Sequence, residues 1–147
     1  MKDSAYLKAE KKIQEALKSG AAELDLSQKF NAKDSEKLTE LPESIGKLKQ
    51  LTSLKLSNTK LTTLPPSLGQ LTQLQTLDLS SNKLTALPDS PLEQLTQLQS
   101  LNLFNNHLTA LPASLGQLTQ LTNLDLSSNQ LTTLPPSLGQ LTQLTEL

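Results

Sequence analysis

The chain has 147 residues, a formal net charge of −1, 35% apolar residues and no cysteine. The near-zero charge excludes a nucleic acid or an acidic membrane as a partner held by bulk charge, and no apolar run approaches a membrane span. Without cysteine, disulfides and thiolate metal sites are impossible. The apolar content is almost all leucine, with 37 leucines, two isoleucines and no valine. A core of one residue type is typical of a repeat array, in which one small packing problem recurs.

Residues 4–19 predict an amphipathic helix. Its apolar side chains fall at helical spacing between lysines and glutamates: Tyr6, Ala9, Ile13, Ala16 and Leu17. Asp3 or Ser4 can cap its N-terminus, and Gly20 stands where a helix-ending glycine belongs. Such a helix could bind a partner or a membrane surface. We favour the alternative that residues 1–20 form an N-terminal cap, because a solenoid needs its open end covered.

Residues 21–50 predict an irregular first repeat. Two of its segments, LDLS and LTELPESIGKL, match the units that follow. The polar segment QKFNAKDSEK lies between them as an insertion. Phe30, within this insertion, either tucks under the cap helix or is exposed.

The remaining chain, residues 51–147, repeats itself. The segment LTTLPPSLGQLTQL occurs at residues 61–74 and again at 131–144, and the sequence divides into units 51–73, 74–97, 98–120 and 121–143. The second unit has one extra residue, in DSPLEQ around Pro91. Residues 144–147 begin a further unit without a polar cap. We expect either that the chain is a piece of a longer protein or that this uncapped C-terminal end self-associates.

Each unit predicts three pieces. The segment LxxLxL suits a short strand with, for example, Leu77 and Leu79 inward and Asp78 outward. The segment LTxLP suits a turn, and SLGQL has room for one turn of α- or 3-10 helix. Burying a leucine contributes roughly 1.5–3 kcal/mol, whereas ordering the backbone of each residue costs roughly 1–2 kcal/mol. One unit is therefore unstable alone and must stack on its neighbours, which predicts an α/β solenoid.

The pattern LxxLxLxxNxLTxLPxSLGQLTQ resembles the leucine-rich repeat in its 23-residue form with an LP in the turn. It is similar to repeats of bacterial, especially cyanobacterial-type, proteins and of Roco-type GTPases and Ras-related leucine-rich repeat proteins. The start KKIQEALKSGAAELDLS also resembles the way Roco-type repeat segments begin. The resemblance implies a right-handed solenoid with parallel strands on the concave face, 3-10 or short helical turns on the convex face, and a function in protein binding.

One asparagine position in the pattern predicts a structural ladder. Asn82, Asn106 and Asn129 stand three residues after the second strand leucine. An amide there can both donate to and accept from the inward-facing backbone of the turn. In the first unit Asn58 precedes this position, which holds Thr59 instead. We expect weaker packing between the first and second units for that reason.

The sequence offers no set of catalytic residues, no cofactor motif and no metal ligands. His107 is the only histidine, and neither GxxxxGK[ST] nor GxGxxG occurs. Asp78 and Asp125 share a strand position two units apart, roughly 10 Å, and with Asn102 between them could imitate a glycosidase carboxylate pair. Their open surface does not favour acid–base chemistry, so we expect no enzyme.

The outward residues of the strands form columns on the concave face, where we expect a partner protein to bind. Phe104 is the only aromatic residue in the repeats, and aromatic residues anchor interfaces. It could equally be a lone exposed apolar residue. The predicted partner-binding residues, taken by unit, are Ser53, Lys55, Ser57, Thr76, Asp78, Ser80, Ser100, Asn102, Phe104, Asn123, Asp125 and Ser127.

The predicted function is therefore a non-catalytic module that binds another protein. One alternative is a recognition or regulatory fragment of a larger signalling protein such as a Roco-like GTPase. A second is a structural or ice-binding array that uses a column of threonines. The start MKDSAYLKAEKKIQ lacks the apolar core of a signal peptide, and the absence of cysteine fits a reducing compartment, so we expect a cytoplasmic location.

Overall fold

Helix α1 (Ser4–Ser19) opens the chain in the computed structural model, which describes residues 1–147. The Asp3 side chain accepts a hydrogen bond from the Tyr6 N–H at 2.8 Å, and Gly20 ends the helix with a φ of 65°. Both caps match the sequence prediction. The predicted apolar stripe is wrong at one residue, since Leu17 is exposed and Ala5 is buried. The helix thus turns its small alanines toward the first repeat, and alanine allows a close approach of the two backbones.

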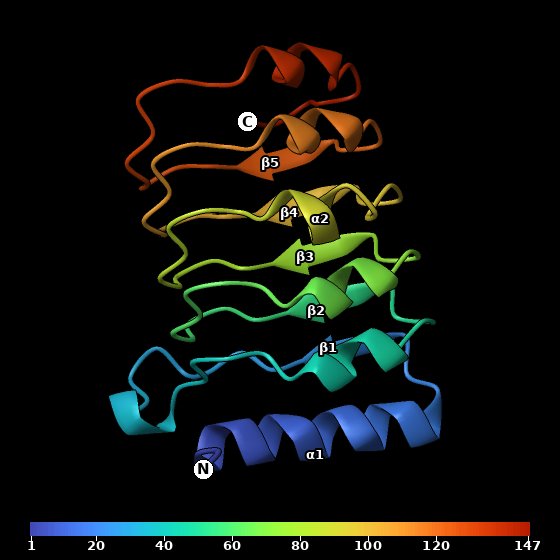
Figure 1. Cartoon of the computed structure of the whole chain (residues 1–147), viewed down its shortest axis with the longest axis vertical. Coiled ribbons are helices and arrows are strands. Elements are labelled where there is room, and N and C mark those ends of the chain that lie inside the picture. Colours follow the sequence, from blue (N-terminus) through green and yellow to red (C-terminus); the bar gives the residue numbers. More distant parts are fainter.

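Five short strands form one parallel sheet in the order β1-β2-β3-β4-β5. The strands are β1 (Glu23–Asp25), β2 (Ser53–Lys55), β3 (Thr76–Asp78), β4 (Ser100–Asn102) and β5 (Asn123–Asp125). Residues at the same repeat position are paired, as Leu54 with Leu77 and Leu77 with Leu101. Figure 1 shows the strands stacked along the long axis, with α1 across the lower end. The predicted right-handed solenoid and its N-terminal cap are confirmed.

A second column of short helical turns lies opposite the sheet. Four of the turns are 3-10 helices, η2 (Glu43–Lys47), η3 (Pro66–Gln70), η4 (Ala113–Gln117) and η5 (Pro136–Gln140), and a fifth, α2 (Asp89–Leu92), is α-helical. The extra residue of the second unit explains the difference. It lengthens the turn so that the Glu93 N–H reaches back four residues to the Asp89 carbonyl at 3.0 Å.

Leucines from every unit form one continuous core between the sheet and the helical turns. Most of them are almost fully buried, including Leu54, Leu77 and Leu101. Burial falls off in the last unit, where Leu131 and Leu138 are half-buried and Leu134 is 52% exposed. None of the helices combines the length and the apolar character needed to cross a membrane.

The insertion of the first repeat forms a loop with a short 3-10 helix, η1 (Asp34–Glu36). Of the two placements considered for Phe30, the structure has the exposed one, because 86% of this residue is accessible to solvent. The loop returns to the array at Leu38, which is buried. The Lys60 Nζ lies 2.8 Å from the Asp34 Oδ2, so the insertion is tied to the next repeat by an ion pair.

Candidate protein-interaction surface

The sheet register aligns the predicted partner-binding residues into columns. Ser53, Thr76, Ser100 and Asn123 pair in one column, and Lys55, Asp78, Asn102 and Asp125 pair in the next. The third predicted column lies just beyond the strands, because each strand ends after three residues. It contains Ser57, Ser80, Phe104 and Ser127. The backbone there is still held across the repeats, for example by the Ser81 N–H, which donates to the Phe104 carbonyl at 2.8 Å.

Three members of the second column, Asp78, Asn102 and Asp125, have a structural role that was not predicted from the sequence. The Oδ1 atoms of Asp78, Asn102 and Asp125 each accept a hydrogen bond from the backbone N–H two residues later, at 2.9 Å. The Ser80 hydroxyl donates to the same Asp78 oxygen at 2.6 Å. The signal in the sequence is an Asp or Asn two residues before a strand-ending turn, which is a typical Asx-turn arrangement. One oxygen of each aspartate therefore shapes the turn, and the other makes no hydrogen bond within the chain.

The same arrangement recurs at Asp25, whose Oδ1 accepts the Ser27 N–H at 2.9 Å. Burial opposes ionisation of this carboxyl, but the hydrogen bonds from Ser27 outweigh it, and Lys55 and Lys12 add to their effect, so the pKa of Asp25 is below its usual value. The charged form is favoured in the folded state. This contribution to stability is present above the unfolded-state pKa and is lost as the pH falls through the folded-state pKa.

Phe104 is the largest apolar side chain on the concave side and is 39% exposed. Its N–H and carbonyl are both hydrogen-bonded, to Asn102 and Ser81 respectively. The backbone that carries the ring is therefore held in place, and an aromatic side chain with only two χ angles loses little entropy when it is ordered on binding. The other members of its column are serines, which leaves the ring standing above its neighbours.

Three asparagines form a hydrogen-bonded column inside the turns. The Asn106 Nδ2 donates to the carbonyls of Leu79 and Leu103 at 3.0 and 3.1 Å, and its Oδ1 accepts the Leu84 N–H at 3.0 Å. Asn82 makes the corresponding bonds one unit earlier, to Leu56, Leu79 and Leu61. Asn129 does so one unit later, where the side chain is only half-buried. Each amide therefore joins two consecutive units.

Thr59 occupies the corresponding place in the first unit. Its hydroxyl donates to the Leu56 carbonyl at 3.2 Å and contacts the Asn82 Oδ1. The carbonyl of Leu26 and the N–H of Leu38 consequently have no asparagine partner, and the Leu26 carbonyl accepts only a long hydrogen bond from Gln28, at 3.5 Å. The predicted position of the weaker interface is therefore wrong. Asn82 joins the first and second units fully, and the missing asparagine contact lies between residues 21–50 and the first unit.

Asparagine in place of Thr59 is expected to raise the free energy of unfolding by about 1 kcal/mol, because it supplies one donor and one acceptor to these two backbone groups. Urea unfolding followed by circular dichroism measures the change, and Thr59→Ser, which adds no amide, is the matched control. In the unmodified chain, amides near Thr59 should exchange faster than those near Asn106. Equal exchange, or no gain from asparagine, contradicts this expectation.

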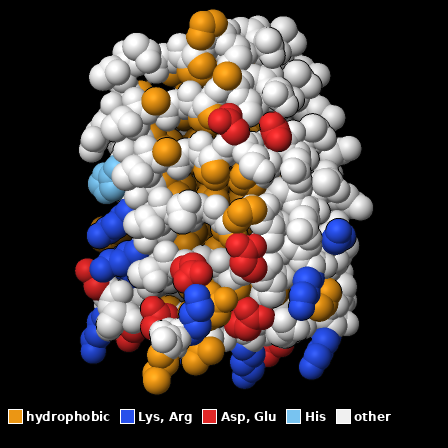
Figure 2. Space-filling model, in the orientation of Figure 1, with side chains coloured by type: hydrophobic (Ala, Val, Ile, Leu, Met, Phe, Trp, Pro, Cys, Tyr) orange, Lys and Arg blue, Asp and Glu red, His pale blue; other side chains and the backbone are white.

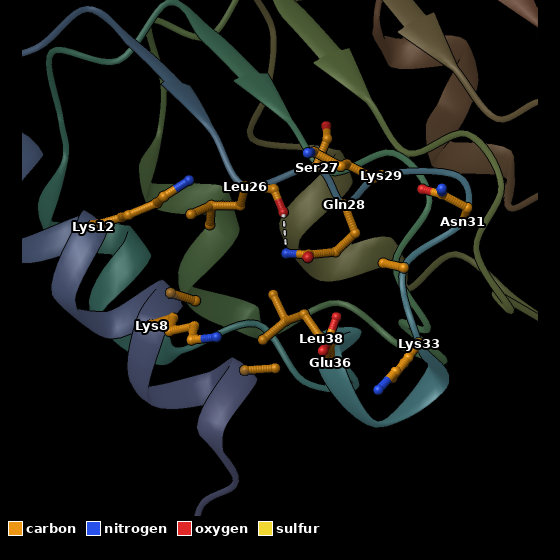
Figure 3. Close-up of a pocket in the computed structure, with 13 residues that line it drawn as sticks. Lys8, Lys12, Leu26, Ser27, Gln28, Lys29, Asn31, Lys33, Glu36 and Leu38 are labelled. Carbon is orange, nitrogen blue, oxygen red and sulfur yellow. Dashed lines mark hydrogen bonds between the residues drawn. The ribbon is translucent and has the colours of Figure 1, made fainter.

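Two cavities lie at the ends of the array. One of about 610 Å³ is bounded by α1, the end of β1 and the insertion. Figure 3 shows Lys8 reaching into it and Lys33 directed away from it, so the surrounding lysines do not converge on a common point. The other, of about 700 Å³, is open and is lined by concave residues of β4 and β5 and by leucines of the last unit, including Leu131 and Leu134.

The residues considered for chemistry lie apart. His107 is exposed in a turn, and Asp78 and Asp125 flank Asn102 on strands two apart in the sheet. No three histidine, aspartate or glutamate side chains gather in a way that could hold a metal ion. What the structure presents is a regular, solvent-accessible face of a solenoid repeat protein.

The class defined by this fold and face is that of repeat proteins with a parallel concave sheet. The family model for the leucine-rich repeat matches residues 34–84, 49–108, 72–131 and 96–147, so the chain belongs to the leucine-rich repeat family. Repeat proteins of this family generally serve as protein-interaction modules and are typically not enzymes. A search of curated protein sequences gives no match.

Two solved structures illustrate the similarity. A leucine-rich repeat protein of Leptospira interrogans is 38% identical over 91% of this chain, with a TM-score of 0.70. An internalin of Listeria monocytogenes is 32% identical over 75% of this chain, with a TM-score of 0.64. This chain spans 38% and 31% of the lengths of those two chains.

Proposed function

We propose that the concave face binds another protein, with Phe104 as the central apolar anchor and the polar columns beside it as the specificity-determining contacts. The observation that carries the proposal is the single exposed ring on an otherwise polar sheet surface whose strands pair in register. Buried aromatic anchors surrounded by weaker polar contacts are typical of interaction hot spots. The free oxygens of Asp78 and Asp125 favour a partner with basic or hydroxyl groups opposite them.

The test compares proteins captured from a source-cell lysate by the immobilised chain and by two double variants. In Ser100→Arg with Phe104→Ala, a bulky cation obstructs the sheet and the anchor is lost. In Gln117→Arg with Gln94→Ala, the same kinds of change fall on exposed positions of the convex side. We expect the concave variant to lose at least about 30-fold in capture of the specific partner, the size of a typical hot-spot loss. Equal capture by all three chains contradicts the proposal.

Self-association is a second candidate, favoured by the incompletely buried leucines of the last unit. Leu134 is 52% exposed and borders the open cavity at that end. Apolar surface of this kind favours burial against a second copy. Sedimentation velocity over a range of concentrations tests this candidate. The sedimentation coefficient of the unmodified chain should rise with concentration, and that of Leu134→Lys should not.

The remaining alternatives rest on sequence features alone. The threonines considered for ice binding, Thr62, Thr85, Thr109 and Thr132, are all exposed along the turns. A thermal-hysteresis measurement decides that alternative. A role within a larger signalling protein of the Roco type depends on residues outside this chain.

A further inference from the structure

A column of basic residues runs along the turns at the edge of the concave face. One repeat position, immediately before the first leucine of each LTxLP segment, holds a basic residue in four consecutive units: Lys37, Lys60, Lys83 and His107. The N–H groups of Lys60, Lys83 and His107 donate to the carbonyls of Leu38, Leu61 and Leu84 at 2.8–2.9 Å. These bonds stack the four residues directly, at about 5 Å per unit. We call Lys37, Lys60, Lys83 and His107 the basic column.

The basic column borders a shallow groove that contains one acid and one aromatic ring. The groove, of about 280 Å³, is lined by all four column residues, by Asp34 and by Phe30. Phe30 is the only hydrophobic residue in its lining and is 86% exposed. Figure 2 shows basic side chains below the single histidine on one edge of the molecule, while other basic and acidic side chains are spread over its lower half. Positive charge and an accessible ring therefore share one surface.

Asp34 shows which chemical group this surface accepts. Its carboxylate bonds the Lys60 Nζ at 2.8 Å, although 75% of the aspartate side chain is open to solvent. The hydrogen bond from Lys60 lowers the pKa of Asp34 first, the charge of Lys60 adds to this, and the charges of Lys37 and Lys83 act in the same direction. Lys37, Lys60 and Lys83 thus stabilise one carboxylate at the N-terminal end of the column. The side chains of Lys83 and His107 themselves form no hydrogen bond or ion pair.

We propose that the basic column is a second docking surface, distinct from the concave columns, for an acidic segment of a partner protein. The carboxylates of that segment extend from Asp34 along Lys83 and His107, and one apolar side chain of the segment covers Phe30. Acidic residues three or four apart on a helix are spaced by about 5–6 Å, close to the spacing of the column. Charge complementarity, rather than shape, selects this partner.

The same observations favour an acidic protein over a nucleic acid. A protein that binds DNA typically contacts about 6–10 phosphates, whereas the basic column has three lysines and one histidine. The chain has no arginine, carries a net charge of −1, and places Asp34 and Glu36 close to the groove. A short segment that carries a few carboxylates can contact the basic column while most of its length stays away from Asp34 and Glu36.

The experiment measures fluorescence anisotropy of a labelled glutamate-rich peptide with one central leucine, at an ionic strength of about 0.15 M, where the Debye length is about 8 Å. Lys83→Glu with His107→Glu reverses the unpaired half of the column. Lys47→Glu with Gln117→Glu makes the same formal charge change at exposed positions of the convex side. We expect the column variant to lose at least about tenfold in affinity and the convex variant to stay within about twofold, because exposed charge pairs act over a Debye length or less. Thermal unfolding of each variant checks that both are folded.

Asp34→Asn supplies an opposite prediction. It removes the internal carboxylate that competes for Lys60, so the peptide should bind more tightly than to the unmodified chain. The proposal is overturned by three results: no binding to the unmodified chain, equal loss in the two charge-reversed variants, or weaker binding after Asp34→Asn. A single-stranded oligonucleotide that binds as tightly as the peptide, and is lost in the same column variant, assigns the surface to nucleic acid and overturns the proposal as well.

Discussion

Replacement of Asn106 by alanine is expected to lower the free energy of unfolding by about 3 kcal/mol, because it removes three hydrogen bonds and leaves one buried donor without a partner. The donor is the N–H of Leu84, whereas the carbonyls of Leu79 and Leu103 keep their hydrogen bonds from Asn82 and Asn129. Asn106 is only 3% exposed, so water cannot replace the amide without opening the turn. Urea unfolding followed by circular dichroism measures the loss.

Asn129→Ala is the matched comparison, since Asn129 makes the same kinds of hydrogen bond from a half-buried position. Water can reach that turn, so the expected loss there is about 1 kcal/mol, the usual net contribution of a hydrogen bond. Equal losses at Asn106 and Asn129 would show that burial does not set the size of the effect. Amide exchange adds a local readout, because only Asn106→Ala should expose the turn between the second and third units.

Alanine at Gly116 is expected to destabilise the last unit by about 2–3 kcal/mol through overpacking. A Cβ at this position would lie 2.4 Å from the Ser137 carbonyl oxygen and 2.6 Å from the Ser137 Cβ. The oxygen belongs to the backbone of the next turn, so η5 would have to move away from η4. Amide exchange measured by NMR should rise across residues 121–147 and stay unchanged near α1.

The repeat itself provides the control. Gly139 occupies the same repeat position one unit later, where an added Cβ would meet nothing within 4 Å. Gly139→Ala is therefore expected to leave stability unchanged or to raise it by up to about 1 kcal/mol, as alanine restricts the unfolded chain more than glycine does. If both substitutions have the same effect, the glycine is present for its conformational freedom and not for the close approach of consecutive turns.

The fold could be predicted from the sequence because the leucine period leaves few arrangements of the chain that bury the leucines. A unit of about 23 residues cannot bury its leucines alone, so stacking follows from the pattern. The ends of α1 were also predictable, since the capping residue Asp3 and the terminating Gly20 act locally. Leu17 was predicted to be buried and is not, because which face of a helix packs depends on the surface beneath it, and the helix spacing alone does not reveal that surface.

The candidate site was less predictable, because several of its features depend on residues far apart in the sequence. Asp78 and Asp125 both form Asx turns, and the local pattern Asp-x-Ser could have predicted this role. The basic column was equally visible as Lys37, Lys60, Lys83 and His107 at one repeat position. The carboxylate of Asp34 was not, since the insertion QKFNAKDSEK has no counterpart in the other units and its path is set by tertiary contacts with Lys60.

The strictly consecutive order of the strands has a mechanical consequence. Each strand pairs only with those of the preceding and following units, and each interior asparagine joins only two neighbouring units. A pulling force applied to the C-terminus therefore loads one interface at a time, beginning where the leucines are least buried. The units are expected to unfold one after another under force, starting with the last unit, and the first repeat with α1 is expected to unfold last.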